Sequence, residues 1–189
     1  FVSPIQKEYE FMSITTKKGD DGTTGLMFNR KVRKYHPNVE ACGSVDELNA
    51  ALGIVRAYCK NKNINEQIYS IQNDLIGLMG ELATLAEDVE LYRSSGFRTL
   101  KNEDADRLHK CIDEYSGEIK KMQGWAIPGE SKSSAFLDLA RTICRRAERR
   151  VCLLQKETKY LNPSIIIYLN RLGDLLWLMA RIVEKGAEK

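Results

Sequence analysis

The sequence predicts an all-helical fold, a single up-and-down bundle of five helices. Long stretches place apolar residues three and four positions apart, which is the pattern of an amphipathic helix. Two or three of these stretches run for about 25 residues, a length that suits helices packed along one another in a bundle. The 189 residues are enough to bury one substantial core, and no internal repeat or low-complexity tract interrupts them.

The first three helices are expected between residues 44 and 123. The first begins after Gly43, where Ser44 followed by Glu47 has the form of a capping box. The second covers about 64–87 on a stripe of isoleucines and leucines, and 88–101 is a connection. The third starts near Asn102, a good cap followed by acidic residues, and ends before Gly124.

The last two helices follow a break at 124–129, which contains two glycines and a proline. One runs from about Ser131 to Glu157. The other opens at Asn162 with Pro163 in its first turn and continues to about Lys185. By contrast, 13–33 is not helical in pattern; we expect a structured glycine-rich loop there, with a short extended piece at 25–28.

Composition and charge narrow the function classes. The formal net charge of +3 is too small to indicate nucleic acid by itself, and no apolar run approaches the roughly 20 residues of a membrane span. The five cysteines are odd in number and show no C-x-x-C spacing, so we expect reduced thiols in a reducing compartment, the cytoplasm. Residues 1–11 precede Met12 without the form of a signal peptide; we treat them as an extension to a single domain, 12–189.

The segment from Thr16 to Gly25 has the donors that a polyphosphate requires. Its closely spaced glycines let backbone N–H groups converge on an anion, and threonine hydroxyls and lysine ammonium groups add further donors. It is not a Walker A loop, because no Gly-Lys-Ser/Thr ends it. The alternative is a glycine-rich surface loop without a ligand.

The fourth expected helix carries five arginines within ten residues, from Arg141 to Arg150. Helical spacing puts Arg141, Arg145 and Glu148 on one face, with the other three arginines pointing elsewhere. Guanidinium groups suit bidentate phosphate contacts, although a solvated basic face with a Glu–Arg pair would give the same pattern.

Two further polar features lie on helices. Asn170 and Asp174 share a face of the last helix among leucines, so they need partners, either a ligand or an inter-helix hydrogen bond. Near the start of the first helix, Glu47 serves as a capping residue, and Asp46 is a candidate partner for an arginine of the basic helix.

In their order and in their motifs, these segments resemble the ATP:cob(I)alamin adenosyltransferases of the propanediol-utilisation type, and the resemblance runs from Thr16 to about Arg181. The motifs that carry the resemblance are T-K-x-G-D-x-G-T-T-x-L, V-E-A-x-G-x-V-D-E-L-N-A (39–50), A-R-T-I-C-R-R-A-E-R-R (140–150) and Y-L-N-R-L-x-D-x-L (168–176).

The resemblance implies a homotrimer of five-helix bundles with active sites between adjacent subunits. By motif match, ATP contact falls on Thr16, Lys17, Lys18, Gly19, Thr24, Lys34, Arg145, Arg146, Glu148, Arg149 and Asn170. Arg141 matches an arginine that pairs with an aspartate of the neighbouring subunit, at the position of Asp46. These two residues and Arg145 form the implied catalytic group.

The implied reaction moves the 5′-deoxyadenosyl group of ATP onto Co(I) of a reduced corrinoid such as cobalamin, with release of triphosphate. The corrinoid supplies the nucleophile, so the protein positions the substrates and stabilises the leaving group. Mg²⁺ would be held mainly by ATP oxygens. A reductase and a cobalamin-dependent acceptor enzyme would be partners; nucleic acid and membranes would not.

Three positions depart from the pattern of the family. Trp125 stands where an aromatic, usually Phe, excludes the lower axial ligand of cobalt, so it is the expected corrinoid contact unless it only caps the core. The usual Pro-Gly-Gly turn reads 128–130 Pro-Gly-Glu, and a frequent Gly-Gly pair reads Phe28-Asn29.

Two other classes of protein share some of these features. A ferritin-like di-iron bundle needs about two Glu-x-x-His pairs, and the nearest approach here is Asp106-x-x-His109. A non-catalytic basic helical module that binds nucleic acid or an acidic partner would use the arginines, but would leave the glycine-rich loop and Asn170 unexplained.

Overall fold

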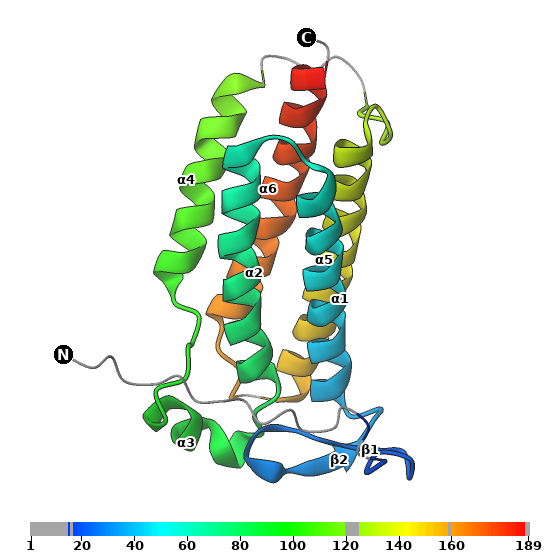
Figure 1. Cartoon of the computed structure of the whole chain (residues 1–189). Coiled ribbons are helices and arrows are strands. Elements are labelled where there is room, and N and C mark those ends of the chain that lie inside the picture. Colours follow the sequence, from blue (N-terminus) through cyan, green and yellow to red (C-terminus); the bar gives the residue numbers. More distant parts are fainter. Residues whose placement is uncertain (1–14, 16, 120–124, 159, 188–189) are drawn as a thin grey trace, which may run out of the picture.

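Five long helices run side by side in the computed structural model, which describes residues 15, 17–119, 125–158 and 160–187 (Figure 1). They are α1 (Pro37–Tyr58), α2 (Lys62–Leu82), α4 (Asn102–Glu118), α5 (Lys132–Glu157) and α6 (Ser164–Ala187). One end of the bundle carries the short helix α3 (Val89–Ser94), the 3₁₀ turns η1 (Met27–Asn29) and η2 (Ala86–Asp88), and a hairpin of β1 (Thr23–Gly25) and β2 (Lys31–Arg33). Among the described residues, no helix combines the length and apolar character needed to cross a membrane.

The last two long helices lie where the sequence predicts them. Ser131 caps α5, its hydroxyl accepting a hydrogen bond from the backbone N–H of Ser134 at 3.1 Å. Before α6, the side chain of Asn162 accepts one from the N–H of Ser164 at 3.0 Å. In both helices the local capping chemistry and the apolar stripe indicate the same start, so the boundaries could be predicted.

The predicted start of the first helix is wrong. The helix begins at Pro37, and His36 caps it by accepting a hydrogen bond from the N–H of Asn38 at 3.3 Å. Ser44 is no cap: it lies inside the helix and donates to the carbonyl of Glu40 at 2.8 Å. A serine followed three residues later by a glutamate has the same sequence in mid-helix, where the hydroxyl bonds back to the preceding turn.

Two further expected boundaries differ from the structure. The second helix ends at Leu82 rather than near 87, and the expected connection contains α3. The third helix begins at Asn102 and ends at Glu118, as predicted. The extended piece expected at 25–28 is instead two strands, pairing Thr23 with Arg33 and Gly25 with Lys31. Three-residue strands are too short to show alternation in a sequence. The extension proposed for 1–11 lies outside the described residues.

A single core holds the bundle together. Buried leucine, isoleucine and valine side chains from all five long helices form it, including Leu48, Leu75, Leu108, Leu137 and Leu172. Burying each such side chain stabilises the fold by about 1.5–3 kcal/mol. The five cysteines are all free thiols.

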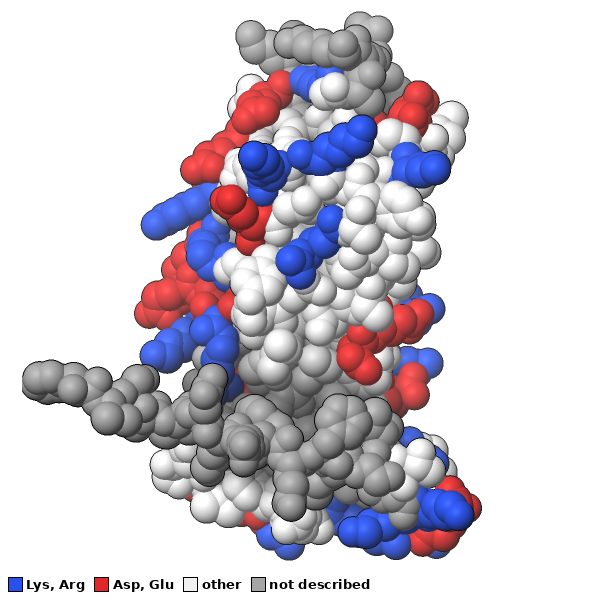
Figure 2. All heavy atoms as spheres, in the orientation of Figure 1, with Lys and Arg blue, Asp and Glu red and all other residues white. Residues whose placement is uncertain are grey.

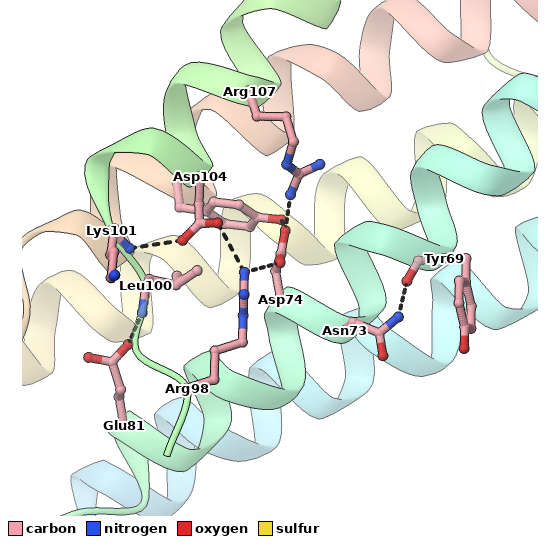
Figure 3. Close-up of polar contacts among 10 residues, drawn as sticks. Tyr69, Asn73, Asp74, Glu81, Arg98, Leu100, Lys101, Asp104 and Arg107 are labelled. Atoms are coloured by element: carbon pink, nitrogen blue, oxygen red, sulfur yellow. Dashed lines mark hydrogen bonds and ion pairs between the residues drawn. The ribbon is translucent and has the colours of Figure 1, made fainter. Parts of the chain in front are cut away.

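A buried carboxylate, that of Asp74 in α2, ties the neighbouring elements together (Figure 3). Arg98 from the connection and Arg107 from α4 both form ion pairs with it, and the Tyr168 hydroxyl of α6 donates to it at 2.8 Å. Arg98 also reaches Asp104 at 3.0 Å. Burial and this carboxylate raise the pKa of Tyr168 well above its usual range. The network fixes α4 and the connection against α2 and α6.

Candidate active site

The glycine-rich loop is folded tightly onto the hairpin. Lys17 and Gly22 have φ angles of 56° and 78°, and the Gly22 N–H donates to the Gly19 carbonyl at 3.2 Å. Hydrogen bonds from Thr23 and Lys31 surround the Asp21 carboxylate and hold its pKa well below the usual range. Asp21 therefore stays charged and fixes the turn, a role that the sequence pattern did not reveal.

The loop and hairpin enclose a surface hollow of about 700 Å³, large enough for a triphosphate. Four cationic side chains line it. Arg30 and Lys31 are engaged by Asp88 and Asp21, whereas Lys18 and Lys34 have no ion pair with a described residue. The hollow thus offers two uncompensated ammonium groups to an anion.

Gly19 makes room for Lys34. A Cβ at Gly19 would lie 3.0 Å from the carbonyl of Thr23 and 3.3 Å from the Lys34 Nζ. Lys34 also borders a second hollow beside Glu47 and Arg146, so it connects the loop with the arginine helix. Of the predicted loop residues, Lys18, Gly19, Thr24 and Lys34 line the first hollow. Lys17 is exposed, and Thr16 lies outside the described residues.

Arg145 occupies the centre of a polar cluster between α5 and α6. Its guanidinium donates to Glu148 at 3.0 Å, to the Asn170 side chain at 2.8 Å and to Asp174 at 2.5 Å. Gly173 allows this approach, because a Cβ there would lie 2.7 Å from the Arg145 Cζ. The sequence prediction that Asn170 and Asp174 share a face and need partners is confirmed.

The remaining arginines do not form a free basic surface. Arg146 forms an ion pair with Glu47, and Arg150 pairs with Glu40 at 3.1 Å, so α1 compensates two of the charges. Arg149 is exposed and has no ion pair with a described residue. This compensation removes much of the positive field on which a nucleic-acid module would depend.

Arg141 is held by a buried carboxylate that the sequence reading missed. Its Nε donates to Asp138 Oδ1 at 3.1 Å, and the other oxygen of Asp138 accepts from the buried Arg181 at 2.5 Å. Arg181 also pairs with Glu184 at 2.7 Å. The signal available in the sequence was a single charge, Arg181, between the apolar residues 178–180 and 182–183. This arrangement leaves the terminal nitrogens of Arg141 without a partner among the described residues.

Asp46 does not meet Arg141 within the chain. It is exposed on α1, beside a hollow that Thr24 and Met79 also border, and forms no ion pair with a described residue. The pairing expected between Asp46 and Arg141 across a subunit boundary therefore stays a prediction.

Trp125 is 97% exposed, so the core-capping alternative does not hold within this chain. The segment before α5 lies at the opposite end of the bundle from the hairpin (Figure 1). With 26 residues, α5 is about 39 Å long. One chain therefore does not bring Trp125 near the loop hollow.

Charged side chains gather along the edges of the bundle and at the hairpin end, while the middle of the face over α2 and α1 is largely uncharged (Figure 2). In the described part of the chain, no three histidine, cysteine or acidic side chains lie close enough together to hold a metal ion.

These features match one family of proteins. Residues 14–183 match the family model described as cobalamin adenosyltransferase, and the chain belongs to that family. It is 35% identical over 178 residues to the corrinoid adenosyltransferase PduO of Citrobacter freundii. The aligned region covers 94% of this chain and 52% of that protein. The chain thus spans about half the length of that relative.

Shorter relatives and solved structures align along most of their length. The corrinoid adenosyltransferase of Bacillus subtilis is 35% identical, and the aligned region covers 91% of this chain and 86% of that protein. A variant PduO-type ATP:corrinoid adenosyltransferase from Lactobacillus reuteri, complexed with cobalamin and ATP, superposes with a TM-score of 0.84 at 30% identity, covering 93% of this chain and 95% of that one. The helical bundle predicted from the sequence is the fold of these relatives.

Proposed function

We propose that this protein is an ATP:corrinoid adenosyltransferase. In the reaction, Co(I) of the reduced corrinoid attacks C5′ of ATP, a cobalt–carbon bond forms, and the C5′–O bond breaks with its electrons leaving on triphosphate. The observation that carries the proposal is the Arg145 cluster, together with membership of the family.

The chain supplies charge and position rather than a nucleophile. Lys18 and Lys34 in the loop hollow would bind the polyphosphate and stabilise the charge that develops on the leaving group. Arg145, oriented by Asn170 and its acidic neighbours, would contact ATP with a guanidinium whose direction is already fixed. Thr16, Lys17, Gly19, Thr24, Arg146, Glu148 and Arg149 complete the proposed ATP contacts.

Two chains are needed to complete the site in this proposal. Arg145 faces α6, while the second hollow, which shares Lys34 with the loop hollow, borders α1 and Arg146, so Arg145 and this hollow lie on different faces of α5. Trp125 lies a helix length away from the hairpin, yet transfer requires direct contact between the corrinoid and ATP. In a homotrimer with sites between subunits, a neighbouring subunit would supply the groups that one chain holds too far apart. Asp46 of one subunit would then pair with Arg141 of the next.

We propose that Mg²⁺ enters with ATP and is held mainly by phosphate oxygens. The side chains lining the hollow are mostly cationic or neutral, which suits an anion better than a metal ion. A reductase that delivers Co(I) and an enzyme that accepts the adenosylated corrinoid complete the proposed set of partners.

The direct test mixes the protein with chemically reduced cob(I)alamin and Mg-ATP. We expect loss of the Co(I) absorbance and appearance of a light-sensitive cobalt–carbon product. Arg145→Ala and Lys17→Ala should each lower activity about ten- to a hundredfold, because a charge-assisted phosphate contact contributes about 1.5–3 kcal/mol. Unchanged helical circular dichroism is the control. A variant with wild-type ATP affinity and turnover would remove that residue from the site.

Trp125 and the assembly have separate tests. Trp125→Ala should spare ATP binding but leave bound cob(II)alamin five-coordinate by electron paramagnetic resonance, with slower adenosylation. A four-coordinate spectrum and normal turnover would contradict the corrinoid role. Light scattering should report a trimer, and a stable monomer at micromolar concentration would exclude the pairing of Asp46 with Arg141.

A further inference from the structure

The turn of the hairpin that borders the loop hollow also contacts residues 83–97, the segment that contains α3. Arg30 forms two hydrogen bonds with the buried Asp88 carboxylate, at 2.6 and 2.7 Å. The Met27 N–H also donates to the carbonyl of Ala83 at 3.0 Å. Both contacts join the turn of the hairpin to the residues that follow α2, and the two elements lie together at one end of the bundle (Figure 1).

Aromatic rings form a second attachment. Phe28 meets Phe97 edge to face at a centroid distance of 6.3 Å, and Phe97 stacks on Tyr92 at 5.1 Å. Tyr92 is buried in a notch over Gly80, where a Cβ would collide with its hydroxyl. The three stacked or edge-to-face rings therefore connect the hairpin turn to α2 at Gly80.

The backbone at this turn is strained. Phe28 and Asn29 both have left-handed conformations, with φ angles of 56° and 59°. Asparagine tolerates this region, but a bulky residue such as Phe28 rarely adopts it, and strained positions persist only when surrounding contacts hold them. The residues beside Phe28 are not remote from the ligand: Leu26, Asn29 and Arg30 line the loop hollow.

We propose that Asp88 and Phe97 are positioning residues for ATP: by clamping Arg30 and Phe28, they hold the strained hairpin turn so that the loop hollow keeps its shape before the nucleotide binds. This inference rests on the proposed function of the hollow. Neither Asp88 nor Phe97 lines the hollow itself. A change at Phe97 therefore acts on ATP only through the hairpin, whereas a change at Asp88 acts through the hairpin and through the charge of Arg30, which lines the hollow.

The test compares Mg-ATP binding by titration calorimetry in the unchanged chain and in four variants, at residues 88, 91 and 97. Asp88→Asn should weaken binding about tenfold, because the amide offers Arg30 one uncharged acceptor oxygen in place of two carboxylate oxygens and no longer holds the hairpin turn. Phe97→Ala should weaken it about three- to tenfold, and Phe97→Tyr, which keeps the ring, should bind nearly as the wild type does. Leu91→Ala is the matched control, because Leu91 is 48% exposed on α3 and outside this cluster.

Hydrogen exchange separates positioning from a general loss of structure. In Asp88→Asn and Phe97→Ala, exchange should accelerate in 23–33 and stay unchanged in α5 and α6. Wild-type affinity in both variants would overturn the inference, as would weakened binding in Leu91→Ala. If the wild-type chain itself fails to bind Mg-ATP, the proposed function of the hollow fails instead.

Phe28→Gly provides a second test, because its effects on the backbone and on the ring contact have opposite signs. Glycine removes the backbone strain at this position but also removes the ring. If the ring anchors the hairpin, ATP binding weakens about three- to tenfold despite the relieved backbone. Binding that stays equal or tightens would show that the ring contributes nothing to the site.

Discussion

Gly173→Ala tests whether the placement of Arg145, rather than its charge alone, is required for activity. A Cβ at residue 173 would lie 2.7 Å from the Cζ and Nε of Arg145, whereas ordinary contacts begin near 3.4 Å. The guanidinium must therefore move by 3.4 − 2.7, or about 0.7 Å. Directed away from α6, a shift of that size stretches the bond to Asn170 from 2.8 Å to at most about 3.5 Å, at the limit of a hydrogen bond.

The expected outcome is a loss of activity without a loss of fold. Losing one charged hydrogen bond costs about 1.5–3 kcal/mol, so adenosylation of cob(I)alamin should slow about ten- to a hundredfold. Alanine improves helix propensity by up to about 1 kcal/mol, which offsets part of the lost contact in thermal unfolding.

The matched control is Gly117→Ala, at an exposed position of α4 where a Cβ meets no atom within 4 Å. It should keep wild-type turnover. Wild-type turnover in Gly173→Ala as well would refute the reasoning, because it would mean that the reaction tolerates a displaced Arg145.

Two further predictions concern the stability of the core. Tyr168→Phe, measured by urea unfolding, should cost about 1.5–3 kcal/mol because the lost bond goes to the charged Asp74; Tyr115→Phe, which loses a bond to neutral Gln67 at 3.0 Å, should cost about 0.5–1.5 kcal/mol. Equal costs would contradict the role of the carboxylate. Burial raises the pKa of the Cys144 thiol to about 12 from its ordinary 9.0, so the unfolded chain loses this proton first and stability falls as pH rises above about 9. Cys144→Ala should remove up to about 1.4 kcal/mol per pH unit from that decline between pH 9 and 11, and parallel slopes for the two proteins would contradict it.

The bundle could be predicted where local and tertiary preferences agree. In α5 and α6, a capping side chain and a long apolar stripe mark the same boundaries, and the helices begin within two residues of the expected positions. The start of α1 was misjudged because Ser44 and Glu47 have the spacing of a cap but lie in mid-helix. There, Glu47 instead binds Arg146 of α5, a contact that depends on how two helices pack.

The residues of the candidate site, too, could be predicted only where the signal is local in sequence. Motif spacing was sufficient to nominate Arg145, Glu148 and Asn170, because residues three and four apart on one helix share a face. Asp138 and Arg181 were not predicted as partners, because they lie 43 residues apart and meet only when α5 and α6 pack.

The sequence by itself determined the helical class, the polar residues of each helix face and the family motifs, since each depends on neighbours within about one or two helical turns. Only the tertiary structure decided which charges are compensated, how the Phe28 turn is held against α3, and that Trp125 and the loop hollow lie at opposite ends of one chain. The physical reason is that ion pairs, ring contacts and strained turns join residues that are distant in sequence, and their geometry exists only once the helices have packed.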